Sequence, residues 1–288
     1  MTPYAEVIGD PIAQSKSPAI HRFWLDKLGL RSDYRATRVT TGDLSQYLDR
    51  RRNDADWRGC NVTMPLKCDI LPLLTGTTQV ATDVGAVNTV FRDEHGRLVG
   101  SNTDVAGFLE PLQARLRQTH YFRMARIIGT GGAARAAVAA LLPHNFAIVL
   151  IGRDPDKARA LLQDADPAGF EKGDHHTPPL SHFASPTDFA FDDRAGCLDL
   201  VVNASPLGMA GQPPMAFDMS HAPPGGVFYD MVTAPVRTPL LMAAEAAGFE
   251  TIDGLAMLIG QAAAAFALFY GVDPPREHDA ELRERLIA

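Results

Sequence analysis

The stretch Gly59-Cys60-Asn61-Val62-Thr63-Met64-Pro65-Leu66-Lys67 predicts a β-strand that ends near Thr63 and a helix that begins near Leu66. Proline suits the first turn of a helix, because its missing N–H would have no partner there in any case. Asn61, Thr63 and Lys67 are the polar residues at this junction. A lysine close to a helix N-terminus is unfavourable for the helix dipole. Lys67 is therefore either a solvated surface residue or part of a functional site.

Segments typical of strands and of helices alternate around this stretch, through the N-terminal third of the chain. The alternation predicts an α/β domain. Ser17, directly before Pro18, is a suitable N-cap for one of the helices. The expected strands are residues 4–8, 34–40, 61–63, 86–91 and 98–100, and the expected helices are residues 18–28, 43–52 and a short one after Thr77 or Thr78.

A glycine-rich motif, Gly129-Thr130-Gly131-Gly132-Ala133-Ala134, lies between the apolar segments 124–128 and 147–151. It stands in the βαβ context that a dinucleotide-binding fingerprint requires. Gly129 and Gly131 permit a tight turn and close approach of a pyrophosphate, and Ala134 replaces the third glycine. The N-terminus of the helix expected at 135–142 offers N–H groups to phosphates. The alternative is a glycine-rich turn that binds no ligand.

The end of the second strand of this unit distinguishes NADP from NAD. An NAD site usually carries an acid there for the ribose hydroxyl, whereas an arginine accommodates a 2′-phosphate. Gly152, Arg153 and Lys157 follow the strand, so the sequence favours NADP. Asp154 is a contrary signal, although it fits equally well as the N-cap of a helix that begins at Pro155.

Composition argues against several classes of function. The chain of 288 residues is long enough for two domains, and its 46% hydrophobic and 21% charged residues are typical of a soluble globular protein. A net charge of -7 without a basic stripe argues against a nucleic-acid partner. No apolar run approaches the ~20 residues that a membrane span needs, and no signal peptide is expected.

Cysteine and histidine usage predicts no metal site. Cys60, Cys68 and Cys197 lack the spacing of a zinc site, and an odd number of cysteines suits reduced thiols in the cytoplasm. His175 and His176 have no supporting cysteine or carboxylate cluster, so we expect exposed loop histidines.

The C-terminal half alternates further strands and helices, but residues 163–196 allow no assignment. Gln261 is the polar residue inside an alanine-rich helix, where it faces either solvent or the interior. The expected strands are residues 198–203 and 226–231, and the expected helices are residues 239–247, 255–270 and 276–287, the last of which we expect to pack on the first domain.

Taken together, the chain resembles the shikimate dehydrogenase family from end to end. The motifs that carry the resemblance are residues 9–18, 61–67, 85–89, 102–104, 129–134, 203–209 and 253–261. It implies an α/β fold of two domains, a discontinuous substrate domain (1–103 with 255–288) and an inserted Rossmann-type NADP-binding domain (104–254). The implied reaction is reversible reduction of 3-dehydroshikimate to shikimate by NADPH, a cytoplasmic step of aromatic amino-acid (chorismate) biosynthesis. A homodimer is compatible with the resemblance.

The resemblance also implies roles for individual residues. Lys67 and Asp104 would form the catalytic pair, because reduction of a ketone needs a positioned acid and the reverse reaction needs a base. Ser15 and Ser17 would bind the substrate carboxylate. Its ring hydroxyls would be bound by Thr63, Asn88, Asp104 and Gln261. The cofactor would be bound by Gly129, Thr130, Gly131, Gly132, Ala133, Gly152, Arg153, Lys157, Met231 and Gly254.

One position departs from the family pattern. The family often has a substrate-binding tyrosine two residues after Met231, and this chain has Thr233 there. Relatives of the same superfamily oxidise quinate with NAD, although the intact pair Ser15 and Ser17 favours shikimate. A non-catalytic dinucleotide-sensing protein on the same fold is a further alternative.

Overall fold

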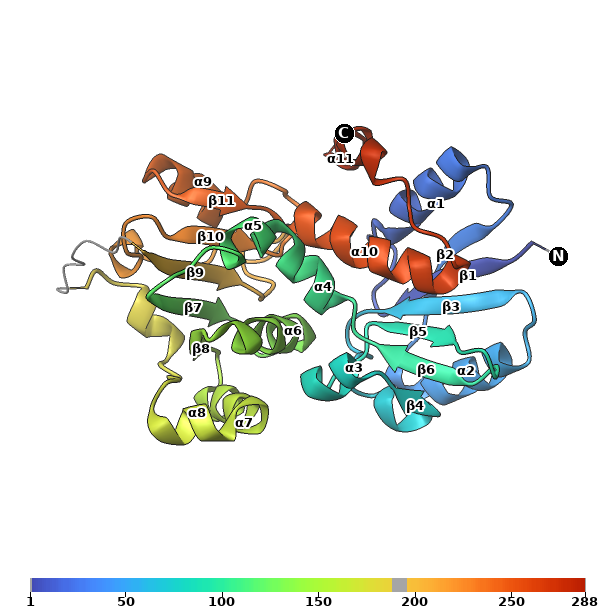
Figure 1. Ribbon diagram of the computed structural model, residues 1–288, viewed down its shortest axis with the longest axis horizontal. Coiled ribbons are helices and arrows are strands. Elements are labelled where there is room, and N and C mark those ends of the chain that lie inside the picture. The colour runs from blue at the N-terminus through green and yellow to red at the C-terminus, as the bar shows by residue number, and fades with distance from the viewer. Residues whose placement is uncertain (1, 188–195, 288) are drawn as a thin grey trace. The chain divides into compact units, whose positions relative to one another are not determined.

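The computed structural model describes residues 2–187 and 196–287. The chain forms two compact units, each built around its own β-sheet (Figure 1). Unit 1 comprises Met1–Gly107 and Leu258–Ala288, and unit 2 comprises Phe108–Met257. The α/β fold with an inserted second unit is therefore confirmed. The boundaries predicted from the sequence, after residues 103 and 254, lie a few residues before these divisions.

The sheet of unit 1 has the order β2-β1-β3-β5-β6-β4. β1 is parallel to β2 and β3, whereas β5 is antiparallel to β3 and β6. The carboxyl ends of β1, β3 and β6 and the amino end of β5 consequently meet at one edge of the sheet. The strands are β1 (Tyr4–Gly9), β2 (Asp33–Arg38), β3 (Trp57–Val62), β4 (Gly76–Thr77), β5 (Thr89–Arg92) and β6 (Leu98–Ser101).

The helices of unit 1 follow the predicted pattern closely, but one predicted cap is wrong. Gly29 ends the first helix in the left-handed conformation, with φ 62°. Lys16, not Ser17, occupies its N-cap, and Ser17 is a buried residue of the helix itself. The helices are α1 (Ser17–Leu28), α2 (Leu44–Arg52), α3 (Gln79–Val84), α4 (Asp104–Leu109, which runs on into unit 2), α10 (Gly254–Tyr270, which starts in unit 2) and α11 (Asp279–Ile287), with short 3-10 helices η1 (Thr41–Asp43), η2 (Leu71–Leu73) and η7 (Arg276–His278).

The helix predicted at Leu66 is wrong. Hydrogen-bonded turns occupy this segment after β3, and the Met64–Pro65 peptide bond is cis. The carbonyl of Lys67 accepts the N–H of Val87 at 2.8 Å, a residue that precedes β5. That carbonyl is therefore committed to a long-range partner, and the backbone of Lys67 does not continue into a helix.

Unit 2 contains a five-stranded parallel sheet with the order β11-β10-β9-β7-β8. The chain leaves β7 toward β8 on one side and returns to β9 on the other, which makes the loops after β7 and β9 a topological switch point. The predicted strand–helix–strand unit is confirmed. The strands are β7 (Phe122–Ile128), β8 (Ala147–Ile151), β9 (Cys197–Asn203), β10 (Val227–Asp230) and β11 (Glu250–Ile252).

The sequence did not predict β11 or the elements between residues 163 and 187. Residues 188–195 of the stretch that we could not assign lie outside the described residues. The helices of unit 2 are α5 (Gln113–Leu116), α6 (Gly132–Leu141), α7 (Pro155–Ala165), α8 (Pro167–Lys172) and α9 (Pro239–Ala246), with 3-10 helices η3 (Glu110–Leu112), η4 (Leu142–His144), η5 (Leu180–Phe183) and η6 (Met219–His221).

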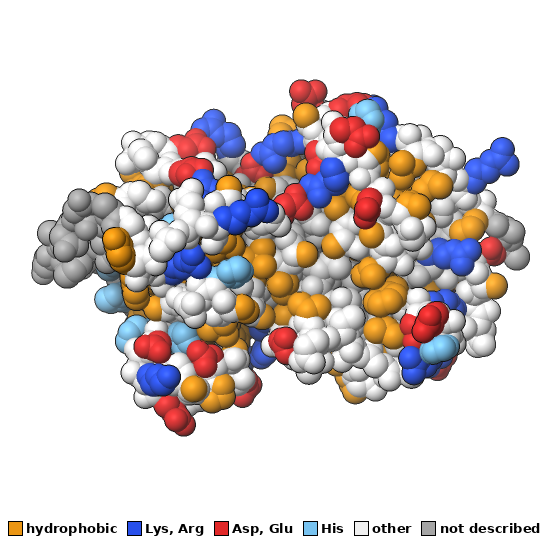
Figure 2. Space-filling view, in the orientation of Figure 1, with side chains coloured by type: hydrophobic (Ala, Val, Ile, Leu, Met, Phe, Trp, Pro, Cys, Tyr) orange, Lys and Arg blue, Asp and Glu red, His pale blue; other side chains and the backbone are white. Residues whose placement is uncertain are grey.

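The C-terminal helix α11 belongs to unit 1, as predicted, where Glu281 pairs with Lys27 of α1 at 2.6 Å. Acidic and basic side chains are mixed on the face of the molecule shown in Figure 2. Over residues 2–187 and 196–287, none of the helices has the length and apolar character of a membrane span.

Candidate active site

The edge of the unit 1 sheet where the strand ends meet brings Lys67 and Asp104 together. Lys67 lies on the turns after β3, and Asp104 is the first residue of α4, just after β6. Lys67 Nζ donates to Asp104 Oδ2 at 2.5 Å, and the two side chains are only 16% and 8% exposed. A charged pair so far removed from water has a stronger interaction than a surface pair. It also provides a proton donor and acceptor in fixed geometry.

Asn88 holds the other oxygen of the Asp104 carboxylate. Its Nδ2 donates to Asp104 Oδ1 at 2.8 Å, and Asn88 is 2% exposed. The backbone N–H of Asp104 donates to Asn102 Oδ1 at 3.1 Å, while Asn102 Nδ2 donates to the carbonyl of Ala86 at 2.8 Å. Both the carboxylate and the backbone of Asp104 are thus held in place by neighbouring amides.

Gln261 of α10 lies beside this group. Its Nε2 donates to the carbonyl of Leu258 at 3.0 Å, and its Oε1 lies 3.5 Å from Thr103 Oγ1. Gln261 is 7% exposed, so the solvent-facing alternative is wrong. The reason is that α10 is apolar around most of its circumference and is largely buried, with Leu268 as its exposed residue.

Ser15, Ser17 and Thr63 are placed by the loops that follow β1 and β3. Ser17 is buried, and its N–H donates to Ser15 Oγ at 3.3 Å. A Cβ atom on Gly9 would lie 2.5 Å from Thr63 Cγ2, so the ends of β1 and β3 are in close contact and glycine is required there. The structure therefore brings Thr63 to the start of the serine-containing loop.

The sequence analysis missed the residues that support Asn88 from behind. Asn61, Thr89 and Thr103 form buried hydrogen bonds with one another and with Asn88. Asn61 was noted only as a polar residue at a strand end, and the two threonines lay inside motifs without a role. Tyr34, whose hydroxyl donates to Asn61 Oδ1 at 2.6 Å, gave no sequence signal at all.

In unit 2 the glycine-rich loop has the geometry of a phosphate site. Gly129 has φ 127°, and a Cβ there would lie 2.7 Å from the carbonyl oxygen of Ala204. Gly131 is the N-cap of α6, without a side-chain cap, and a Cβ on it would meet no atom within 4 Å. The N-terminus of α6 is therefore left without a side-chain cap, and N–H groups at such a helix end can bind phosphates. Thr130, Gly132 and Ala133 belong to the same loop and first helical turn.

The residues after β8 agree with a cofactor that carries a 2′-phosphate. Asp154 Oδ1 accepts the N–H groups of Asp156 at 3.1 Å and Lys157 at 3.3 Å, which confirms Asp154 as the N-cap of α7. Arg153 and Lys157 have exposed side chains. A Cβ on Gly152 would lie 2.8 Å from Thr130 Cγ2, so this strand end packs against the glycine-rich loop.

Met231 and Gly254 are also neighbours. A Cβ on Gly254 would lie 2.6 Å from the carbonyl oxygen of Met231, so only glycine fits there. Asp230 at the end of β10 accepts hydrogen bonds from Thr238 at 2.6 Å and Asn203 at 2.9 Å, and burial raises the pKa of its carboxyl. Thr233, two residues after Met231, is half-buried.

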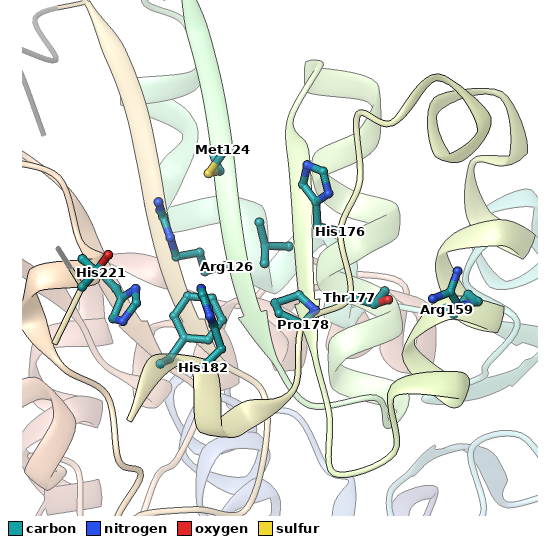
Figure 3. A pocket seen from close by; sticks show the side chains of 11 residues that line it. Met124, Arg126, Arg159, His176, Thr177, Pro178, His182 and His221 are labelled. Atoms are coloured by element: carbon teal, nitrogen blue, oxygen red, sulfur yellow. The ribbon is translucent and has the colours of Figure 1, made fainter. Parts of the chain in front are cut away.

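Unit 2 contains a separate pocket of about 600 Å³, shown in Figure 3. None of the predicted site residues lines it. Its Arg126 forms an ion pair with Asp199 at 3.4 Å. The lining residues are Met124, Arg126, Val149, Arg159, His176, Thr177, Pro178, His182, Phe183, Thr187 and His221.

His175 is not the exposed loop residue that we expected. It is 5% exposed, its Nδ1 accepts the N–H of Ile148 at 3.1 Å, and its Nε2 lies 3.0 Å from Asp166 Oδ2. The histidine thus connects α8 to β8, a contact that no local pattern predicts. Within the described part of the chain, no group of three or more histidine, cysteine or acidic side chains is arranged to hold a metal ion.

The chain has the features of a two-domain dinucleotide-dependent dehydrogenase. One unit is of the Rossmann type and carries a glycine-rich loop without a side-chain cap, and the other is an α/β unit with a largely buried lysine–aspartate pair. Two family models match the chain. The shikimate dehydrogenase substrate binding domain matches residues 7–90, and the shikimate 5′-dehydrogenase C-terminal domain matches residues 254–281. The chain belongs to the shikimate dehydrogenase family.

Similar proteins cover the whole chain. Shikimate dehydrogenase (NADP(+)) of Sphingopyxis alaskensis is 47% identical over 100% of this chain and 98% of its own length. Shikimate 5-dehydrogenase of Thermus thermophilus, solved with NADP(H) and shikimate, is 33% identical with a TM-score of 0.78 over 99% of both chains. Quinate dehydrogenase of Corynebacterium glutamicum, solved with NAD, is 32% identical with a TM-score of 0.82 over 99% of both chains.

Proposed function

We propose that this protein catalyses the reversible reduction of 3-dehydroshikimate to shikimate with NADPH, a step of aromatic amino-acid (chorismate) biosynthesis. The observation that carries the proposal is the buried pair of Lys67 and Asp104, held by Asn88 at the sheet edge of a chain from this family. A protein that only sensed dinucleotides would have no use for a desolvated proton donor and acceptor.

Lys67 and Asp104 move the proton. NADPH, when bound, supplies the hydride to the ketone carbon. The carbonyl oxygen then gains negative charge, and Lys67 Nζ–H is the charged donor of the pair that would neutralise it. In the reverse direction the pair accepts the proton of the hydroxyl. We assign the proton to the pair rather than to one residue, because Nζ and Oδ2 are only 2.5 Å apart.

Other residues of unit 1 bind and orient the substrate. Ser15 and Ser17 bind its carboxylate, since their loop leads from β1 to the N-terminus of α1. Thr63 and Gln261 bind ring hydroxyls, and so does Asn88, whose amide already holds Asp104. The substrate domain comprises residues 1–103 with 255–288, and the cofactor domain comprises residues 104–254.

Unit 2 binds NADP. The loop Gly129 to Ala133 receives the pyrophosphate at the start of α6, where the absent Cβ of Gly131 leaves room. Arg153 and Lys157 would receive the 2′-phosphate, while Oδ1 of Asp154 accepts the two capping hydrogen bonds of α7. Gly152, Met231 and Gly254 line the path of the cofactor.

Quinate oxidation with NAD is the second candidate, because the relative from Corynebacterium glutamicum is a quinate dehydrogenase solved with NAD. Thr233 leaves more room than the tyrosine of the family pattern and would suit a different substrate. The capping role of Asp154 speaks against NAD in this chain.

We also propose a cytoplasmic location, which the three free cysteines support. A homodimer stays a prediction that analytical ultracentrifugation would test.

The deciding experiment is a steady-state assay that crosses shikimate and quinate with NADP and NAD. We expect the highest kcat/KM for shikimate with NADP. Higher kcat/KM for quinate with NAD would establish the second candidate. Binding of NADPH in a calorimetric titration without turnover of either substrate would instead identify a sensor and refute the proposed reaction.

A further inference from the structure

Behind the catalytic pair, a chain of buried hydrogen bonds crosses the sheet of unit 1. The hydroxyl of Tyr34 donates to Asn61 Oδ1 at 2.6 Å, and Asn61 Nδ2 donates to Thr89 Oγ1 at 3.0 Å. Thr89 Oγ1 donates to Asn88 Oδ1 at 2.9 Å, and Asn88 Nδ2 donates to Asp104 Oδ1 at 2.8 Å. All five residues are at most 5% exposed. A continuous polar path therefore leads from the interior to the catalytic carboxylate.

The register of the strands explains this path. Asn61 of β3 stands directly opposite Thr89 of β5, so their side chains are cross-strand neighbours. Tyr34 of β2 is paired with Ala5 of β1, on whose other side β3 lies. Ala5 is in turn paired with Gly59 of β3, two residues before Asn61, so Tyr34 and Asn61 lie on the same face of the sheet. The path thus joins residues from three strands.

Two backbone groups, one that can only accept and one that can only donate, fix the orientation of the side-chain amides of Asn61 and Asn88. The backbone carbonyl oxygen of Asn88 can only accept a hydrogen bond. The side-chain atom of Asn61 that lies 3.3 Å from it must therefore be the donor Nδ2. The N–H of Thr103 can only donate, so the group that faces it at 2.7 Å must be Asn88 Oδ1. These assignments leave Asn88 Nδ2 facing Asp104, as its carboxylate requires.

Thr89 connects the two oriented amides. Its hydroxyl accepts one hydrogen bond from Asn61 and has a single proton left, which it gives to Asn88 Oδ1. Without this hydroxyl, Asn61 Nδ2 loses an acceptor and Asn88 Oδ1 loses a donor. The Asn88 amide would keep its contacts with Thr103 and Asp104, but it would be oriented by one hydrogen bond fewer, so its hold on the carboxylate would weaken.

The inner end of the path is packed against a second buried ring. The imidazole of His21 stacks on the ring of Tyr34 with centroids 3.9 Å apart, and both residues are fully buried. Burial raises the pKa of Tyr34 well above its usual range, so the phenol stays neutral and able to donate. Tyr34 therefore gives Asn61 a donor at neutral pH.

We propose that Thr89, backed by Asn61 and Tyr34, is a positioning residue for proton transfer at Asp104 and Lys67. It contacts neither substrate nor cofactor, and it acts through the amide of Asn88. The inference rests on the proposed function, because it assigns the path to that reaction.

The test compares hydroxyl deletions inside and outside the path, in the full-length chain. Thr89→Val and Tyr34→Phe remove the two hydroxyls of the path, and Thr89→Ser keeps the hydroxyl of Thr89. Matched controls are Tyr47→Phe and Thr37→Val, because both hydroxyls belong to unit 1 and donate to the buried carboxylate of Glu6 instead. For each variant we would measure kcat and KM with shikimate and NADP, and the melting temperature.

The proposal has a distinct kinetic result. Thr89→Val and Tyr34→Phe should lower kcat about 3- to 10-fold, as expected for loss of one neutral hydrogen bond, with an unchanged KM for NADP. Thr89→Ser should restore most of kcat. The controls should lower the melting temperature but leave kcat near the unmodified value.

Two outcomes would overturn the positioning role. In the first, Thr89→Val and Tyr34→Phe fold and keep normal kcat. In the second, the controls lose as much kcat as the path variants, which would reduce the effect to general destabilisation. If the unmodified chain has no activity with shikimate, the proposed function fails rather than the path alone.

Discussion

Replacing Lys67 by alanine tests the catalytic pair most directly. General acid–base groups contribute about 10²- to 10⁴-fold to rate, so we expect Lys67→Ala to lower kcat by that factor. KM should change far less, because proton transfer is a transition-state interaction. Initial rates of NADPH formation from shikimate would measure both constants.

The same substitution also removes the partner of a buried carboxylate. Breaking a buried ion pair costs about 3–5 kcal/mol. The cost at Lys67 should be lower, about 1–3 kcal/mol, because its side chain is 16% exposed and Asn88 still donates to Asp104. Urea unfolding would measure the loss, and kinetics should be recorded well below the melting temperature.

Adding Asp104→Asn separates the two effects. The double variant no longer buries an unpaired charge, so it should regain part of the lost stability while kcat stays low. Lys27→Ala is a matched control, since the Lys27–Glu281 pair is 29% and 38% exposed and should contribute no more than about 1 kcal/mol. Near-normal kcat in Lys67→Ala would remove lysine from the mechanism. Recovery of kcat in the double variant would show that the pair matters only for folding.

Three further predictions concern the cofactor, the substrate and stability. Arg153→Ala should weaken NADP binding about 10- to 100-fold and hardly affect NAD, as expected for loss of a charge-assisted contact; equal losses for both cofactors in titrations would contradict this. Thr233→Tyr should lower the KM for shikimate about 2- to 10-fold, the effect of one neutral hydrogen bond, without changing the KM for NADP; abolished turnover would show that the space is needed. Burial lowers the pKa of His21 to about 3 in the folded protein. As the pH falls below about 6.5, the imidazole therefore gains a proton in the unfolded chain but not in the folded one. The free energy of unfolding should then fall by up to about 1.4 kcal/mol per pH unit. His21→Phe should flatten that dependence. Urea unfolding at pH 5 and 7 would measure the change in unfolding free energy between the two pH values, and an equal change in both proteins would exclude His21 as its source.

The sequence predicted the cofactor-binding unit well because its signals are local. The glycines, the helix and the two apolar strands follow one another between residues 122 and 151. Asp154 showed the limit of such signals. The sequence allowed it to be either an acid for the ribose hydroxyl or a helix N-cap, and only the hydrogen bonds at the start of α7 identified the cap. Where a side chain acts on the backbone next to it, sequence patterns are sufficient.

The predictions failed where a distant partner decides the structure. The helix expected after Pro65 does not form because the carbonyl of Lys67 is bonded to Val87. His175, which was expected in an exposed loop, is buried and accepts the N–H of Ile148 in β8. Val87 and Ile148 lie outside the segments that were interpreted.

The support of the Asp104 carboxylate, which we propose as catalytic, is the clearest case of this dependence on distant partners. Lys67 and Asp104 could be expected at one sheet edge, because both follow strands whose carboxyl ends meet there. The path through Tyr34, Asn61 and Thr89 depends in addition on the register of β1, β2, β3 and β5. A slip of one residue in β3 would turn Asn61 to the opposite face of the sheet and break the path. The strand order places β1 between β2, which carries Tyr34, and β3, which carries Asn61, so only the folded sheet shows that Tyr34 is connected to Asp104.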